Sequence, residues 1–379
     1  MNGFALWPEN RERAGGSGMR QKNRIRAGIL LLTAGVCLTG CGAAQQETEN
    51  LSEQSGNSRE EQYNSGVEQP DTDAQTEETD DLIVVGLSQL GSESDWRIAN
   101  TESYRSTLTA ENGYYLLYDN AQQKQENQLK ALRNFILQEV DYIVVAPIVE
   151  TGWESVLQEA RDANIPVILA DRMVSVEDDS LYTCYVGGNF VQEAEDAGNW
   201  LAGYLQQQGR SEEQINIVTL QGTPGASAEL GRTEGFQNIM KQHSNWNMLE
   251  IRSGDFTQAK GQEVMEYFLE TYDDIDVVIS QNDNMAFGAI DAIQAAGKTC
   301  GPEGDIILIS FDAVSAAFDC MIGGTINADF ECNPLHGPLV DQIIKDMEAG
   351  KGVDKIQYVE ESYFDTSMDL EKIKEGRQY

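Results

Sequence analysis

The sequence predicts an α/β protein whose folded part forms two doubly wound lobes, each built on a parallel sheet. Short, β-branched apolar runs alternate with amphipathic stretches from residue 81 onward. Continuous apolar runs suit strands that are buried on both faces. The repeated strand–helix–strand order implies parallel strands joined by right-handed crossovers. Because the runs outnumber the strands of one compact sheet, two lobes are expected.

The expected elements follow one another in chain order. The strands are the apolar runs at 82–87, 115–118, 142–146, 166–170, 215–220, 277–280 and 306–311. The helices repeat apolar residues at three- and four-residue spacing. They are expected at 122–138, 153–164, 191–208, 259–271 and 284–296. Gly113, Gly209 and Gly297 fall near the ends of helices, where glycine commonly terminates the helix.

The first 41 residues have the pattern of a secretory signal with a lipid-attachment site. Four basic residues between positions 20 and 26 precede an apolar run at 27–38, which is shorter than the about 20 residues of a membrane-spanning helix. A small residue before Cys41 is typical of a bacterial lipoprotein box, and it predicts two acyl chains on this cysteine, enough for a stable anchor. The alternative is an ordinary signal with a coincidental cysteine. Translation starts at Met1 or, if the gene start is over-extended, at Met19.

Residues 42–80 differ from the rest of the chain in composition. They are rich in Glu, Gln, Ser, Asn, Thr and Asp and lack hydrophobic periodicity, which predicts a disordered acidic tether. The first lobe is then expected at 82–188, and most of 189–329 forms the second. The formal net charge of −37 over 379 residues repels nucleic-acid phosphates, so we expect no nucleic-acid partner.

Histidine and cysteine usage gives no sign of a metal centre. The chain has only His243 and His336 and no CxxC pair, so neither a metal nor a cofactor is expected. Four cysteines remain in the folded part, and they can form disulfides in an exported protein or pack as small apolar side chains. These residues are Cys184, Cys300, Cys320 and Cys332.

Polar and aromatic residues gather after the ends of the expected strands. Ligands of open parallel sheets bind beyond the carboxyl ends of the strands. Carboxylates, amides and guanidinium groups hydrogen-bond adjacent sugar hydroxyls, and an indole covers the C–H face of the ring. The sequence therefore predicts a monosaccharide site. Each residue alone is more often a helix cap, a turn or a core residue than a ligand contact, and the convergence of several loops carries the prediction. The candidates are Glu93, Ser94, Asp95, Trp96, Arg97, Asp171, Arg172, Arg232, Asn282 and Asp312.

Several long motifs carry a resemblance to a known family. They are VGLSQLGSESDWR (85–97), NAQQKQENQLKAL (120–132), VVAPIVETGWESVLQEARDANIPVILADR (144–172), LQGTPGASAELGRTEGF (220–236), SGDFTQAKGQEVM (253–265) and QNDNMAFGAI (281–290). From about residue 82 to the end, the chain resembles sugar-binding proteins of the ribose/galactose type, the type I periplasmic binding proteins. Within that group it looks most like the galactofuranose-binding proteins of ABC importers.

The resemblance implies two lobes that are joined by three crossovers and close on the ligand like a clamp. It assigns 82–188 plus 330–355 to the first lobe and 189–329 plus 356–379 to the second. It further implies that the ten candidate residues contact the sugar, and it places Phe256 and Glu331 near the pocket wall. Two positions depart from the family pattern: Asp95 stands where close relatives carry a small residue, and Ala313 where glycine commonly follows the aspartate.

The function implied is binding without catalysis. A lipid-anchored monomer at the outer face of the bacterial cell membrane captures a monosaccharide and passes it to the permease of an ABC importer. One alternative is a sensor lipoprotein that presents sugar to a membrane receptor or histidine kinase. Another is a carbohydrate-active enzyme with Asp171 and Asp312 as paired carboxylates. The enzyme is disfavoured because Arg172 and Asn282 should keep Asp171 ionised rather than poised as an acid.

Overall fold

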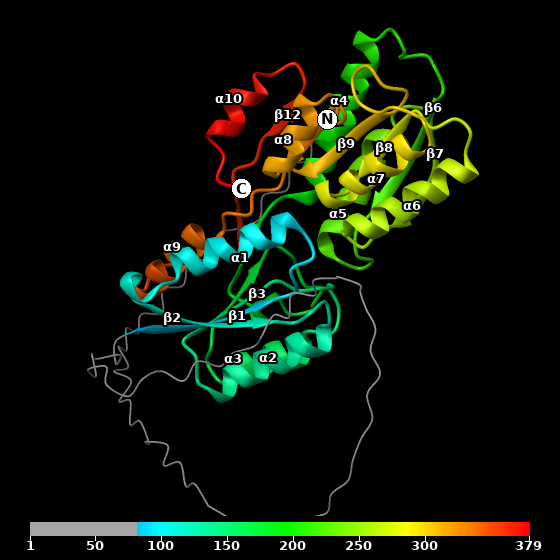
Figure 1. Ribbon diagram of the computed structural model, residues 1–379. Helices are drawn as coiled ribbons and strands as arrows, with labels where there is room; N and C mark the ends of the chain where they lie inside the picture. The colour runs from blue at the N-terminus through cyan, green and yellow to red at the C-terminus, as the bar shows by residue number, and fades with distance from the viewer. Residues whose placement is uncertain (1–81) are drawn as a thin grey trace, which may run out of the picture. The chain divides into compact units, whose positions relative to one another are not determined.

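The computed structural model describes residues 82–379 as two lobes, each with a six-stranded sheet between layers of helices (Figure 1). The predicted signal, Cys41 and the predicted tether lie outside the described residues. Within 82–379, no helix combines the length and the apolar character that crossing a bilayer requires.

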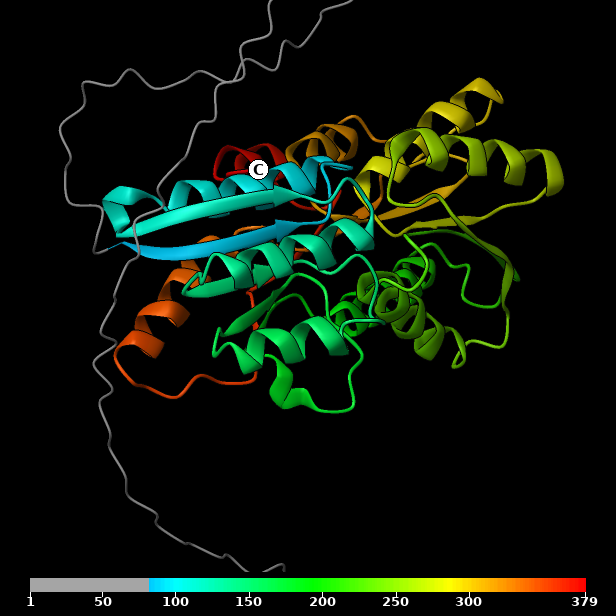
Figure 2. The ribbon, with the colours of Figure 1, turned by 90° about the horizontal axis from the view of Figure 1, so that it is seen from below.

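The first sheet has the strand order β11-β5-β4-β3-β1-β2, and all its pairs are parallel. Its strands are β1 (Ile83–Gln89), β2 (Tyr114–Asn120), β3 (Tyr142–Val145), β4 (Val167–Ala170), β5 (Cys184–Gly187) and β11 (Ile356–Tyr358). Its helices are α1 (Asp95–Thr107), α2 (Gln125–Leu137), α3 (Glu154–Asp162) and α9 (Gly337–Glu348). Helices α2 and α3 cover one face, and α1 and α9 cover the other (Figure 2).

Strand β3 shows why an uninterrupted apolar run suits this sheet. Ile143 and Val145 pack with α2 and α3, whereas Tyr142 and Val144 pack in the cluster that holds α1 and α9. All four side chains are buried. Both faces of the strand therefore contribute to a core, as the sequence predicts.

The second sheet has the order β12-β10-β9-β8-β6-β7, and only the edge strand β12 is antiparallel to its neighbour. Its strands are β6 (Ile215–Gln221), β7 (Trp246–Ser253), β8 (Val277–Ser280), β9 (Ile307–Asp312), β10 (Ala328–Glu331) and β12 (Tyr363–Asp365). Helices α4 (Phe190–Gln207) and α5 (Ser227–Met240) cover one face. The other face carries α6 (Gln258–Thr271), α7 (Asp283–Ala295) and α8 (Ser315–Ile322), and α10 (Leu370–Glu375) packs beside α8.

The elements expected from the apolar pattern are confirmed, and their ends agree with the structure to within three residues. Gly209 and Gly297 follow α4 and α7 with φ near 74°, a left-handed conformation that ends a helix without steric cost in glycine. Short 3₁₀ helices at Ala110–Asn112 and Asp179–Leu181 were not expected. Gly113 (φ 91°) ends the first of them rather than an α-helix.

Three chain crossings connect the lobes, at residues 188–189, 332–336 and 359–362. The expected boundaries at 330 and 356 fall a few residues too early. Strand β10 continues to Glu331 in the second sheet. The short strand β11 pairs with β5 in the first sheet before the chain returns to the second lobe. A three-residue strand with exposed side chains carries no apolar signal, which explains the error.

Candidate functional site

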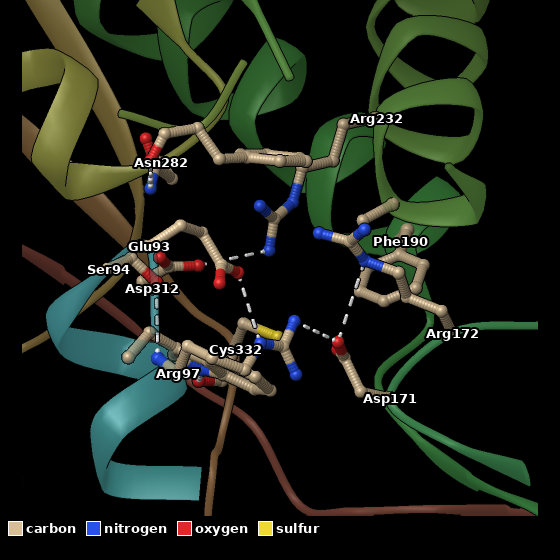
Figure 3. A pocket seen from close by; sticks show the side chains of 13 residues that line it. Glu93, Ser94, Arg97, Asp171, Arg172, Phe190, Arg232, Asn282, Asp312 and Cys332 are labelled. Carbon is tan, nitrogen blue, oxygen red and sulfur yellow. Dashed lines mark hydrogen bonds and ion pairs between the residues drawn. The ribbon is translucent and has the colours of Figure 1, made fainter. Parts of the chain in front are cut away.

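A pocket lies between the lobes, at the carboxyl ends of strands from both sheets (Figure 3). It contains about 300 Å³ of empty space, including space open to solvent. The lining side chains are Glu93, Ser94, Trp96, Arg97, Asp171, Arg172, Phe190, Ala228, Arg232, Phe256, Asn282, Asp312 and Cys332.

Nine of the ten candidate residues line this pocket, and Asp95 does not. Asp95 is the first residue of α1 and its side chain is exposed. It lies at the rim, where it contacts Asn284 of α7 instead. The neighbouring Ser94 caps α1, because its hydroxyl accepts a hydrogen bond from the Arg97 N–H at 3.1 Å.

The first lobe contributes a buried network of charges. Arg97 donates from Nη2 to Asp171 Oδ2 at 2.5 Å and from Nε to Glu93 Oε1 at 3.1 Å. Arg172 donates from Nη1 to the Ile148 carbonyl at 3.0 Å, and its Nε lies 3.7 Å from Asp171 Oδ2. Two buried donors, Arg97 Nη1 and Arg172 Nε, have no hydrogen-bond partner. Such donors are costly unless a ligand satisfies them.

This network fixes the protonation of Asp171. Burial raises the pKa of the Asp171 carboxyl, but the positive charges of Arg97 and Arg172 outweigh burial, so the pKa lies below its usual range. Burial and the neighbouring charge of Arg97 lower the pKa of Arg172 to about 10. At neutral pH, Asp171 is therefore a hydrogen-bond acceptor and both guanidinium groups are charged donors.

The second lobe presents Arg232 from α5. Its Nε donates to Glu193 Oε2 at 2.8 Å and its Nη1 to the Gln281 carbonyl at 2.5 Å. The contact from Nη2 to Asp312 Oδ1 is longer, at 3.4 Å. The rings of Phe190 and Phe311 lie 5.4 and 4.9 Å from the guanidinium carbon. Arg232 is thus held on several sides and presented in one orientation.

Asp312 differs from Asp171 in its electrostatic surroundings. Burial raises the pKa of Asp312 well above its usual range. Arg232 offsets burial only in part, since Glu193 is closer to that guanidinium, and Asp283 adds a repulsive charge. The Asp312 backbone has φ 110°, an uncommon conformation for an aspartate. The pocket therefore offers one carboxyl that stays ionised and one that protonates readily.

Two aromatic rings form walls on opposite lobes. The indole Nε1 of Trp96 donates to the Cys332 carbonyl at 2.5 Å, which fixes the ring plane. The ring of Phe256 packs so closely on Gly222 that a Cβ there would lie 1.9 Å from it. Asn282 caps α7 by accepting from the Met285 N–H at 3.0 Å, and it donates to the Phe256 carbonyl at 3.2 Å. One hydrogen and one lone pair of that amide stay available.

Three lining residues escaped the sequence prediction: Phe190, Ala228 and Cys332. Phe190 follows β5 and Cys332 follows β10, and neither strand has a long enough apolar run to be recognised. Ala228 follows β6, in the same loop that yielded Arg232, but its small apolar side chain gives no chemical signal. Of the two expected wall residues, Phe256 lines the pocket and Glu331 does not. Glu331 instead accepts hydrogen bonds from Arg377 Nη1 at 2.9 Å and from the Tyr379 hydroxyl at 2.5 Å.

The four cysteines of the described residues are free thiols. Burial raises the pKa of the Cys332 thiol well above its usual range, so this residue is not a thiolate nucleophile at neutral pH. Cys332 also belongs to a group of potential metal ligands with Glu193 and Glu361, adjacent to the pocket.

Comparisons with known proteins agree with this architecture. Residues 85–332 match the family model described as a periplasmic binding protein domain. The chain is 40% identical over 299 residues to the galactofuranose-binding protein YtfQ of Escherichia coli (strain K12), covering 77% of this chain and 92% of that protein. A solved structure from Mycobacterium smegmatis in complex with β-D-fucofuranose is 39% identical, with a TM-score of 0.74, over 78% of this chain and 95% of its own.

A second solved structure is equally similar. It is the periplasmic binding protein of the arabinose ABC transporter from Shewanella sp. ANA-3, bound to α- and β-L-arabinofuranose. It is 39% identical, with a TM-score of 0.71, and covers 78% of this chain and 99% of its own. The family model spans well over half of the chain, and the two-lobe fold is shared with these structures. The chain belongs to the periplasmic binding protein family.

Proposed function

We propose that this protein captures a neutral monosaccharide between its lobes and delivers it to the permease of an ABC importer. The observation that carries the proposal is the lining of the pocket, where paired charges and two aromatic walls from different lobes face one another. Sugar contacts from both lobes exist together only in the closed form, so the ligand favours closure. The closed surface is then what the importer recognises.

A furanose is the preferred ligand in this proposal. The relatives at about 40% identity have names or titles that specify galactofuranose, fucofuranose and arabinofuranose. The unpaired donors Arg97 Nη1 and Arg172 Nε suit adjacent hydroxyl oxygens. A sugar that lacks one of these hydroxyls would leave a buried donor unsatisfied, which is the physical basis of selectivity.

Lipid anchoring at Cys41 on the outer face of the cell membrane completes the proposal. The basic flank, the short apolar run and the small residue before Cys41 support it. An anchored binding protein stays close to the permease that it serves.

The enzyme alternative has one supporting observation. Asp171 is ionised and the pKa of Asp312 is raised, the combination that glycosidases use for a nucleophile and an acid. However, Asp171 Oδ2 already faces two guanidinium groups, which weaken it as a nucleophile. The relatives are named as binding proteins. Release of nitrophenol from nitrophenyl furanosides would favour the enzyme, and its absence together with tight binding favours transport.

Calorimetry tests the site directly. The protein is titrated with arabinose, galactose, fucose, ribose and fructose, each a mixture of ring forms. For the sugar that binds, Trp96→Ala, Asp171→Ala and Arg232→Ala should each cost about 2 kcal/mol or more of binding free energy. Leu137→Ala, on the exposed surface of α2, is the matched control and should change nothing. Unchanged affinity in all three site variants would refute the assignment of these residues.

A further inference from the structure

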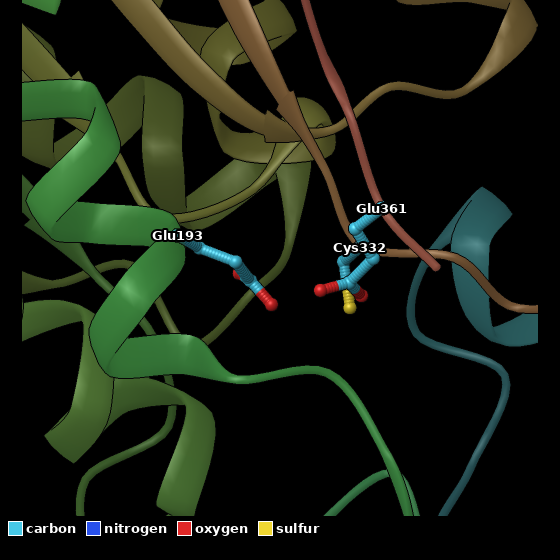
Figure 4. Close-up of side chains that lie close together, drawn as sticks. All are labelled: Glu193, Cys332 and Glu361. Carbon is cyan, nitrogen blue, oxygen red and sulfur yellow. The ribbon is translucent and has the colours of Figure 1, made fainter. Parts of the chain in front are cut away.

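The three chain crossings bring one potential metal ligand each to a common point. Glu193 lies in the first turn of α4, directly after the first crossing, Cys332 opens the second crossing, and Glu361 lies in the third. A carboxylate oxygen of each glutamate and the cysteine Sγ all lie within 4.8 Å of one another. Figure 4 shows the two carboxylates and the thiol directed toward the same space.

Glu193 and Cys332 are buried, Glu361 is half-buried, and one oxygen of the group is unsatisfied. The Glu193 side chain is only 4% exposed. Its Oε2 accepts from Arg232, whereas its Oε1 has no hydrogen-bond partner. On the other side, Glu361 Oε1 accepts from the Asn333 N–H at 3.1 Å. A buried carboxylate oxygen without a partner is rare in folded proteins, and this one needs a proton or a cation beside it.

Gly188 of the first crossing leaves the space between the carboxylates open. A Cβ at this position would lie 2.5 Å from Glu193 Oε1 and 2.6 Å from Glu361 Oε1. No side chain of ordinary size fits there without displacing one of the two groups. The close approach of backbone to both oxygens is thus possible only with glycine.

The charges of the group match a divalent cation. With both carboxylates and the thiolate ionised, the three ligands carry a charge of about −3, and the neighbouring Arg232 supplies one positive charge. A cation of charge +2 would leave the three ligands and Arg232 together electrically neutral.

We infer that Glu193, Cys332 and Glu361 form a binding site for a thiophilic divalent cation of the Zn²⁺ class. Zn²⁺ accepts thiolate sulfur and carboxylate oxygen in a tetrahedral arrangement that a water molecule can complete. Ca²⁺ and Mg²⁺ require more ligands and prefer oxygen alone. The sequence prediction of no metal site rested on the scarcity of histidine and the absence of a CxxC pair. Because these three ligands are far apart in the sequence and include no histidine, neither pattern reveals them.

The site has a consequence for lobe motion, because its ligands lie in or just after three different crossings. Lobe opening rotates the crossing segments against one another. A cation bound to all three segments stabilises one relative arrangement of them. The inference concerns the hinge and stands independently of which sugar the pocket binds.

The test uses the full 379-residue chain after treatment with a chelator. Calorimetric titration with ZnCl₂ should show one site per chain, and CdCl₂ should give the ultraviolet charge-transfer band of a cadmium–thiolate bond. Cys332→Ser should abolish the band, and both Cys332→Ser and Glu361→Gln should weaken Zn²⁺ binding by about tenfold or more. Cys300→Ser removes another buried thiol and should leave both signals intact.

Several results would overturn the inference. Zn²⁺ binding of equal strength in the wild type, Cys332→Ser and Glu361→Gln would mean an adventitious surface site. No Zn²⁺ binding to the wild type would mean that protons alone occupy the group. Thermal unfolding and sugar titration of each metal-free variant show whether it is folded. If Cys332→Ser does not fold, Zn²⁺ binding to Glu361→Gln decides whether the site exists. This variant keeps the size of the side chain and the oxygen that accepts from the Asn333 N–H.

Discussion

Asp95 and Asn284 form two reciprocal hydrogen bonds across the rim of the pocket, although they lie 189 positions apart in the sequence. The Asp95 N–H donates to Asn284 Oδ1 at 3.1 Å, and Asn284 Nδ2 donates to Asp95 Oδ2 at 3.4 Å. Elsewhere along the cleft, the Met173 N–H of the first lobe donates to Ser227 Oγ of the second at 2.9 Å. Contacts between protein groups alone therefore stabilise the closed form, in addition to any ligand.

Removal of the Asn284 amide should shift the lobes toward the open form. Asn284→Ala loses both rim hydrogen bonds, each worth about 0.5–1.5 kcal/mol, so sugar affinity should fall by roughly 5- to 150-fold if both bonds exist only in the closed form. Calorimetry measures the affinity, and small-angle scattering of the sugar-free protein should show a larger radius of gyration. Asp95→Asn keeps the hydrogen-bonding geometry and should behave like the wild type. An unchanged affinity in Asn284→Ala would show that the rim contacts do not contribute to closure.

Asp283 and Asp329 form a second buried carboxyl pair, beneath the turn that follows Asp312. Asp283 accepts from Ser310 Oγ at 2.6 Å and from the Val314 N–H at 2.9 Å, and Asp329 accepts from the Ala313 N–H at 3.1 Å. Burial raises the pKa of both carboxyls, that of Asp329 to about 7, and repulsion between the two charges raises that of Asp283 further. The pair therefore binds protons as the pH falls below neutral.

This pair predicts a specific pH dependence of stability. A carboxyl whose pKa is raised by folding stabilises the folded state below its unfolded pKa of about 4, and this stabilisation is lost as the pH rises toward 7. In Asp329→Asn, the side-chain oxygen still accepts a hydrogen bond from the Ala313 N–H, and the amide N–H groups are donors for Asp283. The amide does not titrate. Its free energy of unfolding in urea should vary less between pH 5 and pH 8 and, at pH 8, exceed that of the wild type by on the order of 1–3 kcal/mol.

A control and a clear contradiction are available for this prediction. Asp354→Asn removes an exposed carboxyl and should leave the pH profile unchanged. If Asp329→Asn shows the same difference in unfolding free energy between pH 5 and pH 8 as the wild type, Asp329 does not bind a proton in the folded state over this range.

Two glycine substitutions should act in opposite directions. Gly222→Ala places a Cβ 1.9 Å from the Phe256 ring, so it should destabilise the fold by about 1–3 kcal/mol and weaken sugar binding as the ring moves. Gly203→Ala, within α4, meets no atom within 4 Å. It should stabilise the protein by about 0.5–1 kcal/mol through helix propensity, at unchanged affinity. Urea unfolding and calorimetry measure both effects; equal behaviour of the two variants would contradict the packing argument.

The proposed anchor predicts that Cys41→Ala changes the location of the protein. Without a thiol to acylate, the variant should not incorporate labelled palmitate, and it should leave the membrane fraction. Cys37 lies within the apolar run of the predicted signal, so the variant Cys37→Ala should still be acylated at Cys41. Continued labelling of Cys41→Ala would show that lipid attaches elsewhere or that the apolar segment itself retains the protein.

The apolar runs predict the central strands because those strands are buried on both faces. The same criterion misses β7, an edge strand in which Glu250 and Arg252 interrupt the apolar residues. It also misses β10, in which Asp329 and Glu331 interrupt the apolar residues, and β11, which has only three residues. Charged residues or a very short length thus hide a strand from this criterion, whether the strand lies at the edge of a sheet or, like β10, inside it.

A site residue could be predicted from the sequence where the strand before it could be recognised. Asp171, Asn282 and Asp312 lie within two residues of the carboxyl ends of recognised strands, and a parallel sheet brings these strand ends together at one edge. Cys332 belongs to a crossing after a strand that the sequence does not reveal. Asp95 differs for another reason: α1 begins at this residue and directs its side chain to the rim, while Trp96 and Arg97 turn inward. The direction of a side chain at the first turn of a helix depends on the exact start of that helix.

The ionic pairing in the pocket also determines what the protein rejects. Three guanidinium groups, of Arg97, Arg172 and Arg232, already face carboxyl groups of the protein. A sugar phosphate or a uronic acid would lose its hydration on entry and find no uncommitted positive charge in return. Phosphate and organic acids in the surroundings of the cell should therefore compete poorly, even though the pocket is rich in arginine.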